Sequence, residues 1–315
     1  MTMYYLGVDL GGTNIKAALV DEQGQILQEA SRPTNLPRSA EAVCDDIAAL
    51  CRELTAGRTV GGIGVGCPGT VDDRTGRVLY SNNLAWADFA MGDYLQAATG
   101  MPVRLANDAN AAALGEALAG CAKGADSAVI LTLGTGVGGG IVLGGKLLTG
   151  YTGAAAEPGH MVICDTKDAP LCTCGRRGDL ESYASATALI RMTREAMQAH
   201  PESALWRFAG LDTVEGRTVF DARDAGDAVA AAVVGQYIHH LAVGIANLVN
   251  IFFPEVVGLS GGVANQGEAL LAPLRAEYEP MVFGAAYAEK KTRLVSCTLG
   301  YRAGVIGAAL LAAQE

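Results

Sequence analysis

The chain has no run of lysine or arginine residues, and its formal net charge is −10. Surfaces that bind nucleic acids need clustered positive charge, so this composition argues against DNA or RNA as a partner. The first apolar strand begins at about residue 4, and we expect no signal peptide before it. The longest apolar stretch, residues 228–253, is broken by glutamine, histidine and asparagine side chains. It therefore predicts a buried helix and no membrane span.

The chain contains eight cysteines among its 315 residues. Without a secretory signal, such cysteines indicate thiols or metal ligands and not a disulfide framework, which places the chain in the cytoplasm. Half of the residues are apolar and 18% are charged, so there is ample material for buried cores. The length predicts two domains.

A Walker loop is absent, because no Gly-Lys-Ser/Thr follows the glycine turn near the N-terminus. That turn, Gly11-Gly12-Thr13, joins two apolar strands and has the composition of a tight hairpin that can adopt positive φ. Backbone N–H groups and the Thr13 hydroxyl in such a turn can approach phosphate oxygens closely. Asp9, at the end of the first strand, can hold Mg²⁺, usually through water. The alternative is a plain glycine hairpin in which Asp9 only forms the turn.

The same plan occurs twice in the chain. Residues 4–27 and 128–148 both show a strand, a Gly/Thr turn, a strand, a second glycine turn and a third strand. Repeats of 20–50 residues would indicate a solenoid, whereas this wider spacing predicts two related domains that face each other.

Each half is expected to have the order βββαβαβα, with insertions. The sequence predicts strands at 4–9, 15–20, 25–31, 60–66, 103–106, 127–133, 137–143, 146–148, 255–260 and 293–297, and helices at 40–55, 91–99, 109–119, 184–199, 227–250, 266–277 and 303–314. Residues 81–86 are expected to form a polar loop. Two such halves bind ligands where the domains meet.

Asp108 lies where a predicted parallel strand ends and a helix begins. Aspartate is among the best helix N-caps, and capping alone would explain it. The functional alternative is a general base at the carboxyl end of a strand, where such sheets place their ligands. Phosphoryl transfer to a hydroxyl group uses one carboxylate to accept the proton, together with Mg²⁺ and N–H donors for the phosphates.

A second set of polar residues predicts a metal site. His160, Cys172, Cys174 and Asp179 lie in an irregular, glycine-rich segment and form a plausible tetrahedral zinc set. The alternative is a polar loop that carries two thiols.

Taken in order, the motifs resemble the ROK family of sugar kinases and repressors over essentially the whole chain. These motifs are Asp9-Leu-Gly-Gly-Thr-Asn14, Asn107-Asp108, Gly134-Thr-Gly-Val-Gly-Gly-Gly140, Glu157-Pro-Gly-His160 and Cys172-x-Cys174-Gly-x-x-Gly178-x-x-Glu181. The resemblance implies the duplicated actin-like (ribonuclease H-like) α/β fold, with sugar and ATP meeting in an interdomain cleft. We expect a sugar/phosphate domain at 1–120, with helix 301–315 packing back onto it, and a nucleotide-binding domain at 121–300 that carries the zinc loop.

The resemblance also implies the site residues. Asp108 would be the base for the exocyclic hydroxyl of the sugar, and the substrate-binding residues would be Gly69, Asn83, Asn107, Asp108, Glu157, His160 and Glu181. ATP and Mg²⁺ would be bound by Asp9, Gly11, Gly12, Thr13, Asn14, Lys16, Thr135, Gly136 and Gly262. One departure concerns the Zn²⁺ site, because Asp179 stands where the family usually has a third cysteine, and Cys164 competes for the fourth position.

The resulting expectation is ATP-dependent phosphorylation of a hexose, with glucose the first choice and N-acetylmannosamine, mannose, fructose and allose open. A repressor is disfavoured, because only eight residues precede Asp9 and no helix-turn-helix fits there. A catalytically inactive sugar sensor is the remaining class. By family resemblance we expect a homodimer or homotetramer.

Overall fold

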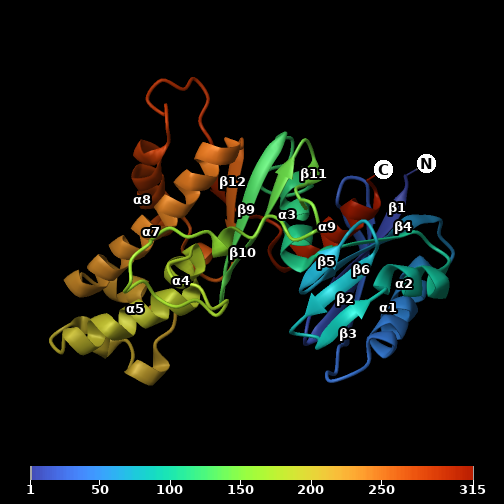
Figure 1. Ribbon diagram of the computed structural model, residues 1–315, viewed down its shortest axis with the longest axis horizontal. Coiled ribbons are helices and arrows are strands. Elements are labelled where there is room, and N and C mark those ends of the chain that lie inside the picture. Colours follow the sequence, from blue (N-terminus) through green and yellow to red (C-terminus); the bar gives the residue numbers. More distant parts are fainter. Residues whose placement is uncertain (1, 315) are drawn as a thin grey trace. The chain divides into compact units, whose positions relative to one another are not determined.

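A computed structural model describes residues 2–314 and shows a mixed α/β chain (Figure 1). Met1, the start of the predicted first domain, and Glu315, the end of the helix predicted to pack back onto that domain, lie outside the described residues. The chain forms two compact units. The first contains the described residues up to Ile130, Gly139–Ala156 and the segment from Cys297 on, and the second contains Leu131–Gly138 and Glu157–Ser296.

The first unit is built on a five-stranded sheet with the order β3-β2-β1-β4-β8. Its strands are β1 (Tyr4–Leu10), β2 (Asn14–Asp21), β3 (Ile26–Pro33), β4 (Val60–Cys67) and β8 (Val103–Asn107). The first three strands pair antiparallel, and β1, β4 and β8 run parallel. The carboxyl ends of β1, β4 and β8 therefore lie at one edge of the sheet, where ligands of such sheets bind.

Helices cover both faces of this sheet. They are α1 (Ala40–Thr55), α2 (Met91–Thr99), α3 (Asp108–Leu118) and α9 (Ala303–Ala312). Alternate side chains of β2 point to opposite faces: Ala17 and Leu19 belong to the core cluster that includes α1, whereas Ala18 and Val20 pack with α9. Helix α9 packs on β1, β4 and α3.

The backbone of α9 approaches the sheet so closely that a side chain at Gly64 of β4 cannot fit, because a Cβ there would overlap the carbonyl oxygen of Ala308. We expect Gly64→Ala to destabilise the chain by about 1–3 kcal/mol, because overpacking forces the helix away from the sheet. Gly235→Ala is the matched control, since a Cβ at Gly235 meets open space. That substitution should stabilise the protein by about 0.5–1 kcal/mol. Urea unfolding measures both, and equal stability of the two variants would contradict the close packing.

A second five-stranded sheet repeats the first. Its strands are β9 (Ser127–Leu133), β10 (Val137–Leu143), β11 (Lys146–Leu147), β12 (Val256–Ser260) and β13 (Arg293–Ser296). Their order, β11-β10-β9-β12-β13, matches that of the first sheet when strands are counted along the chain. The duplication predicted from the glycine turns is therefore confirmed.

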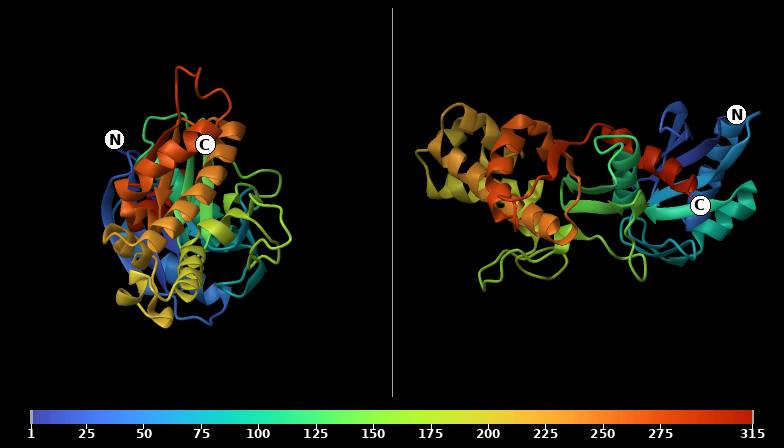
Figure 2. Two further views of the ribbon diagram at one scale, coloured as in Figure 1. Left: turned by 90° about the vertical axis from the view of Figure 1, so that its left-hand side faces the viewer. Right: turned by 90° about the horizontal axis from the view of Figure 1, so that it is seen from above.

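The second unit carries most of the remaining helices. They are α4 (Leu180–Ala184), α5 (Ala186–Ala199), α6 (Thr218–Asp224), α7 (Ala228–Phe252) and α8 (Glu268–Tyr278). Among the described residues, α7 is the one helix whose length and composition would allow it to cross a membrane, and half of its most apolar window is buried. Its buried positions recur at helical spacing, and it packs against α4, α5, α6 and α8 (Figure 2).

Two local predictions are corrected by the structure. The predicted helix at 184–199 is two helices, because Ser185 has extended backbone and caps α5 by accepting a hydrogen bond from Ala188 N–H. Residues around the predicted loop 81–86 belong to a three-stranded antiparallel sheet of β5 (Thr70–Asp72), β6 (Arg77–Ser81) and β7 (Trp86–Phe89). Of the predicted loop, only the residues between Ser81 and Trp86 lie outside strands, and they form the turn between β6 and β7.

Candidate functional site

The turn between β1 and β2 places Asp9 beside Lys16. The two residues are paired across the hairpin, with 3.9 Å between the Lys16 Nζ and Asp9 Oδ2 atoms. Gly11 N–H closes the turn by donating to the carbonyl oxygen of Asn14 at 2.9 Å. The Thr34 hydroxyl donates to the carbonyl oxygen of Gly11 at 2.7 Å, which fixes the turn against the end of β3.

This turn does not use the positive φ that its glycines could adopt, because neither Gly11 nor Gly12 belongs to the residues with positive φ. A Cβ at Gly12 would also meet no atom within 4 Å. Neither backbone conformation nor internal packing therefore requires glycine at position 12. What glycine provides there is an uncovered backbone that a ligand can approach closely.

The sequence left two roles open for Asp108, helix capping and general-base catalysis, and the structure gives the capping role to Asn107. Asn107 is the N-cap of α3, since its Oδ1 atom accepts hydrogen bonds from Ala109 N–H at 2.9 Å and Asn110 N–H at 3.2 Å. Its Nδ2 group donates to the carbonyl oxygen of Gly69 at 3.0 Å. Capping by Asp108 is thus excluded as its explanation, because Asp108 is already the first helical residue.

The Asp108 carboxyl group lies at the carboxyl end of β8, and its Oδ1 atom accepts a hydrogen bond from Ala109 N–H at 2.9 Å. Burial raises its pKa, which hydrogen bonds from Ala109 and Asn107 partly offset. Burial also raises the pKa of Asp9, against the attraction of Lys16 and with a further contribution from the charge of Asp108. Two partly buried carboxyl groups that interact in this way favour a bound cation, because a cation would stabilise both anions.

Two further predicted residues of the first unit lie in turns between strands. Asn83 is exposed in the turn between β6 and β7. Gly69 has a φ of 108°, and a Cβ there would overlap the carbonyl oxygen of Tyr80. Glycine is therefore required at position 69 by the backbone itself. Sequence reasoning missed Gly304 of α9, where an added Cβ would lie 3.1 Å from the Asp9 carboxyl carbon.

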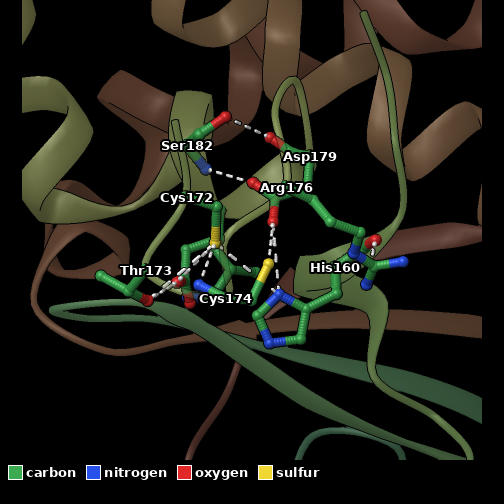
Figure 3. A network of polar contacts seen from close by, with 9 residues as sticks. His160, Cys172, Thr173, Cys174, Arg176, Asp179 and Ser182 are labelled. Carbon is green, nitrogen blue, oxygen red and sulfur yellow. Dashed lines mark hydrogen bonds and ion pairs between the residues drawn. The ribbon is translucent and has the colours of Figure 1, made fainter. Parts of the chain in front are cut away.

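In the second unit, the four predicted zinc ligands come together (Figure 3). One ligand atom from each of His160, Cys172, Cys174 and Asp179 lies within 4.8 Å of the others. The Asp179 Oδ2 atom is 3.3 Å from His160 Nδ1 and 3.5 Å from Cys174 Sγ. The Cys172 Sγ atom lies 3.9 Å from the same His160 nitrogen.

Asp179 has two functions in this loop, because its other oxygen, Oδ1, accepts a hydrogen bond from Ser182 N–H at 3.0 Å and caps α4. Its side chain is fully buried. Burial works to raise its pKa, but hydrogen bonds from Cys172, Ser182 and His160 hold the pKa below its ordinary value. Cys164, the competing fourth ligand, lies outside this group, with its Sγ atom 3.7 Å from Thr166 Oγ1.

Glu181 connects the metal loop to the turn between β9 and β10. Its Oε2 atom accepts a hydrogen bond from Val137 N–H at 2.9 Å, and its Oε1 atom accepts bonds from Cys172 Sγ at 3.5 Å and Thr173 Oγ1 at 3.3 Å. A Cβ at Gly136 would overlap the Glu181 carboxylate. A side chain at position 136 would therefore displace the Glu181 carboxylate from its hydrogen bond with Val137 N–H.

Glu157 directly precedes a 3₁₀ helix, Pro158–His160, that carries His160 into the loop. Gly159 packs against the carbonyl oxygen of Val137, with no space for a Cβ. The Thr135 carbonyl oxygen accepts a hydrogen bond from the Thr187 hydroxyl at 2.7 Å, so that the second turn is also fixed to α5.

Gly262, predicted to pack near adenosine, begins the segment after β12, and a Cβ there would meet open space. Its neighbour Gly261 is the residue for which the backbone requires glycine: its φ is 89°, and a Cβ would overlap the backbone of Leu133. The sequence prediction named Gly262 and not Gly261.

Comparison with known proteins places this geometry in a family. The ROK family model matches residues 5–315. The chain is 39% identical to a glucokinase of Thermotoga maritima over 309 residues, which covers 96% of this chain and 95% of that protein. It is 38% identical to a glucokinase of Halalkalibacterium halodurans over 322 residues, with 99% and 96% covered.

A solved structure agrees with these sequence relatives. The ROK family glucokinase from Streptomyces griseus, crystallised with glucose and AMPPNP, superposes with a TM-score of 0.77 and 36% identity, covering 99% of this chain and 100% of that chain. Together with the repeated strand order, this similarity confirms the predicted duplicated actin-like fold. The chain belongs to the ROK family.

Proposed function

We propose that this ATP-dependent sugar kinase phosphorylates glucose at its exocyclic hydroxyl group, with Asp108 as the general base. The observation that carries the proposal is the partly buried Asp108 carboxyl group at the carboxyl end of β8, which is not used as the cap of its helix. A base that accepts the hydroxyl proton needs a carboxylate in this position. The similarity to glucokinases supports glucose as the sugar.

The remaining hydroxyl groups of the sugar are assigned to amide, imidazole, carboxylate and backbone groups that together offer donors and acceptors. In the first unit these are Asn83, Asn107 and the backbone of Gly69. In the second unit they are Glu157, His160 and Glu181. Asn107 and Glu181 already make hydrogen bonds within the protein, so they would bind the sugar with their remaining donor and acceptor capacity.

We assign nucleotide binding to the glycine turn between β1 and β2, the glycine turn between β9 and β10, and the segment after β12. The phosphate-binding residues are Gly11, Gly12, Thr13, Asn14, Lys16, Thr135 and Gly136, and Gly262 would pack near adenosine. The open space at Gly12 and Gly262 supports these assignments. Asp9 would hold Mg²⁺ through water, and the ion would supply charge stabilisation to the phosphates.

The proposal is tested by a coupled assay of ADP release with glucose, N-acetylmannosamine, mannose, fructose and allose. We expect the highest kcat/KM with glucose. A higher kcat/KM with another sugar would overturn the assignment of glucose as the substrate, but not the assignment of sugar kinase activity. If no sugar stimulated ADP release, the chain would be a non-catalytic sugar sensor. The assay should include Asp108→Asn as a control for contaminating kinases.

The pH dependence follows from the pKa of Asp108. The general base acts in its deprotonated form, and burial raises the pKa of this carboxyl group. As the pH falls through that raised pKa, kcat/KM should fall, and the acid limb should lie above the usual range of an aspartate. The measurement is log kcat/KM for glucose against pH. An acid limb at the ordinary pKa of aspartate would contradict the assignment.

A further inference from the structure

Cys121 and Cys297 lie side by side in the first unit, although they are 176 residues apart in sequence. Their Sγ atoms are 3.9 Å apart, and both residues are partly exposed. Cys121 follows the end of α3, whereas Cys297 lies between β13 and α9. Neither residue belongs to the sugar, nucleotide or zinc assignments above.

One buried carboxylate holds both of these segments. Glu116, on α3, is 1% exposed. Its Oε2 atom accepts hydrogen bonds from the backbone N–H groups of Cys121 and Thr298, each at 3.0 Å. Its Oε1 atom accepts a third from Leu299 N–H at 2.7 Å. The backbone at both cysteines is therefore fixed, and the two thiols are held next to each other.

The same three side chains also have the composition of a metal site, because ligand atoms of Glu116, Cys121 and Cys297 lie within 4.8 Å of one another. The carboxylate, however, already accepts backbone hydrogen bonds at both oxygens. Breaking these part-buried bonds would leave the three backbone N–H groups without this acceptor, which opposes metal binding by the carboxylate. Two thiols alone fall short of the four ligands of a structural zinc site. With a metal site disfavoured, the reaction open to this pair of cysteines is the formation of a bond between their sulfur atoms.

We propose that Cys121 and Cys297 form a reversible intramolecular disulfide. The sulfur atoms would move about 1.9 Å closer to reach the disulfide bond length of about 2.05 Å. With a small-molecule disulfide as oxidant, one cysteine thiolate attacks a sulfur atom of the oxidant and releases one thiol. The second cysteine thiolate then attacks the mixed disulfide and releases the other thiol. The protein loses two protons and two electrons, and the oxidant takes them up to become two thiols.

The bond would close a loop that contains the whole of the second unit, since Leu131–Gly138 and Glu157–Ser296 both lie between the two cysteines. A crosslink over so long a loop restricts the unfolded chain strongly, so the oxidised protein should have a higher Tm. In a reducing compartment such a pair serves as a transient redox-sensing site.

The test exposes the full-length protein to oxidised glutathione, blocks the remaining thiols with an alkylating agent and maps the cysteine peptides. We expect a Cys121–Cys297 linked peptide, a Tm several degrees higher, and reversal of both by dithiothreitol. Cys121→Ser and Cys297→Ser should each lose the link and the shift in Tm. Cys164→Ser is the matched control, since Cys164 is also partly exposed and lies in the second unit, and it should behave as the unchanged protein.

The proposal would be overturned by glutathione adducts on both cysteines without a crosslink in the folded protein. It would equally be overturned if the link formed only after denaturation. Stoichiometric zinc that protects both thiols from oxidation, and that is lost in Cys121→Ser but retained in Cys164→Ser, would identify a metal site there instead.

Discussion

Replacing Asp108 by asparagine should lower kcat for sugar phosphorylation by about 10²–10⁴-fold, the usual contribution of a general base. The amide keeps the size of the side chain and an oxygen that can accept the hydrogen bond from Ala109 N–H, but it cannot accept a proton. Because binding of the sugar does not require proton transfer, KM for glucose should change little. Steady-state kinetics with glucose and ATP measure both constants.

The N-cap of α3 is Asn107, which the substitution at Asp108 does not change. Since the cap is untouched in Asp108→Asn, Tm should stay close to that of the unchanged protein. Asp93→Asn is the matched control, because Asp93 is exposed in the first turn of α2 and should tolerate the same change with no loss of rate. Turnover by Asp108→Asn close to the original rate would show that this carboxyl group is not the base.

The repeated core of the fold could be predicted from the sequence because its signals are local. Each first strand is a short apolar run that ends at a Gly/Thr turn, and these signals occur in the same order in both halves. Strand pairing in a hairpin is also local, so β1 with β2 and β9 with β10 follow from the turns. The parallel strands β4, β8, β12 and β13 follow from their apolar runs and from the helices between them.

The sheet of β5, β6 and β7 could not be predicted in the same way. Its strands are three to five residues long, and polar residues occupy many of their positions. Such short segments carry little periodicity, and their pairing depends on neighbours, among them Val71, Val78 and Trp86 in the core. Sequence reasoning therefore found only the turn at Asn83.

The roles of neighbouring polar residues could not be assigned from the sequence either. Asn107 and Asp108 are both good N-caps, and a shift of one residue in the helix start exchanges their functions. The contact of Glu181 with Gly136 and the hydrogen bonds of Glu116 join residues far apart in sequence. No local pattern reveals such contacts, because they arise only when the sheets and helices have assembled.

Loss of zinc should accompany the removal of the Asp179 carboxylate. We propose that the native protein holds one zinc ion per chain on His160, Cys172, Cys174 and Asp179, because these four residues are already gathered. Carboxylate oxygen is an accepted zinc ligand, and a carboxamide is not among the usual ones. The metal would fix the loop so that His160 and Glu157 face the sugar. Loss of the metal should then raise KM for glucose by about 10–100-fold, with less effect on KM for ATP.

Two substitutions separate the metal from the helix cap, since Asp179 Oδ2 faces the thiols whereas Oδ1 caps α4. Asp179→Asn retains the capping ability, because asparagine caps nearly as well as aspartate, whereas Asp179→Ala loses both functions. If zinc positions the loop, both variants should lose the metal and show a raised KM for glucose. If the cap alone positions the loop, Asp179→Asn should keep the original KM.

The control variant is Cys164→Ser, which should retain zinc, because Cys164 lies outside the ligand group. Metal analysis of the three variants and of the unchanged protein gives the zinc content for comparison with each KM. Zinc lost only in Cys164→Ser would assign the fourth position to that thiol. If the unchanged protein held no zinc after expression in zinc-supplemented medium, the four side chains would be a hydrogen-bonded cluster. The capped helix and the Glu181 contacts would then hold the loop without a metal.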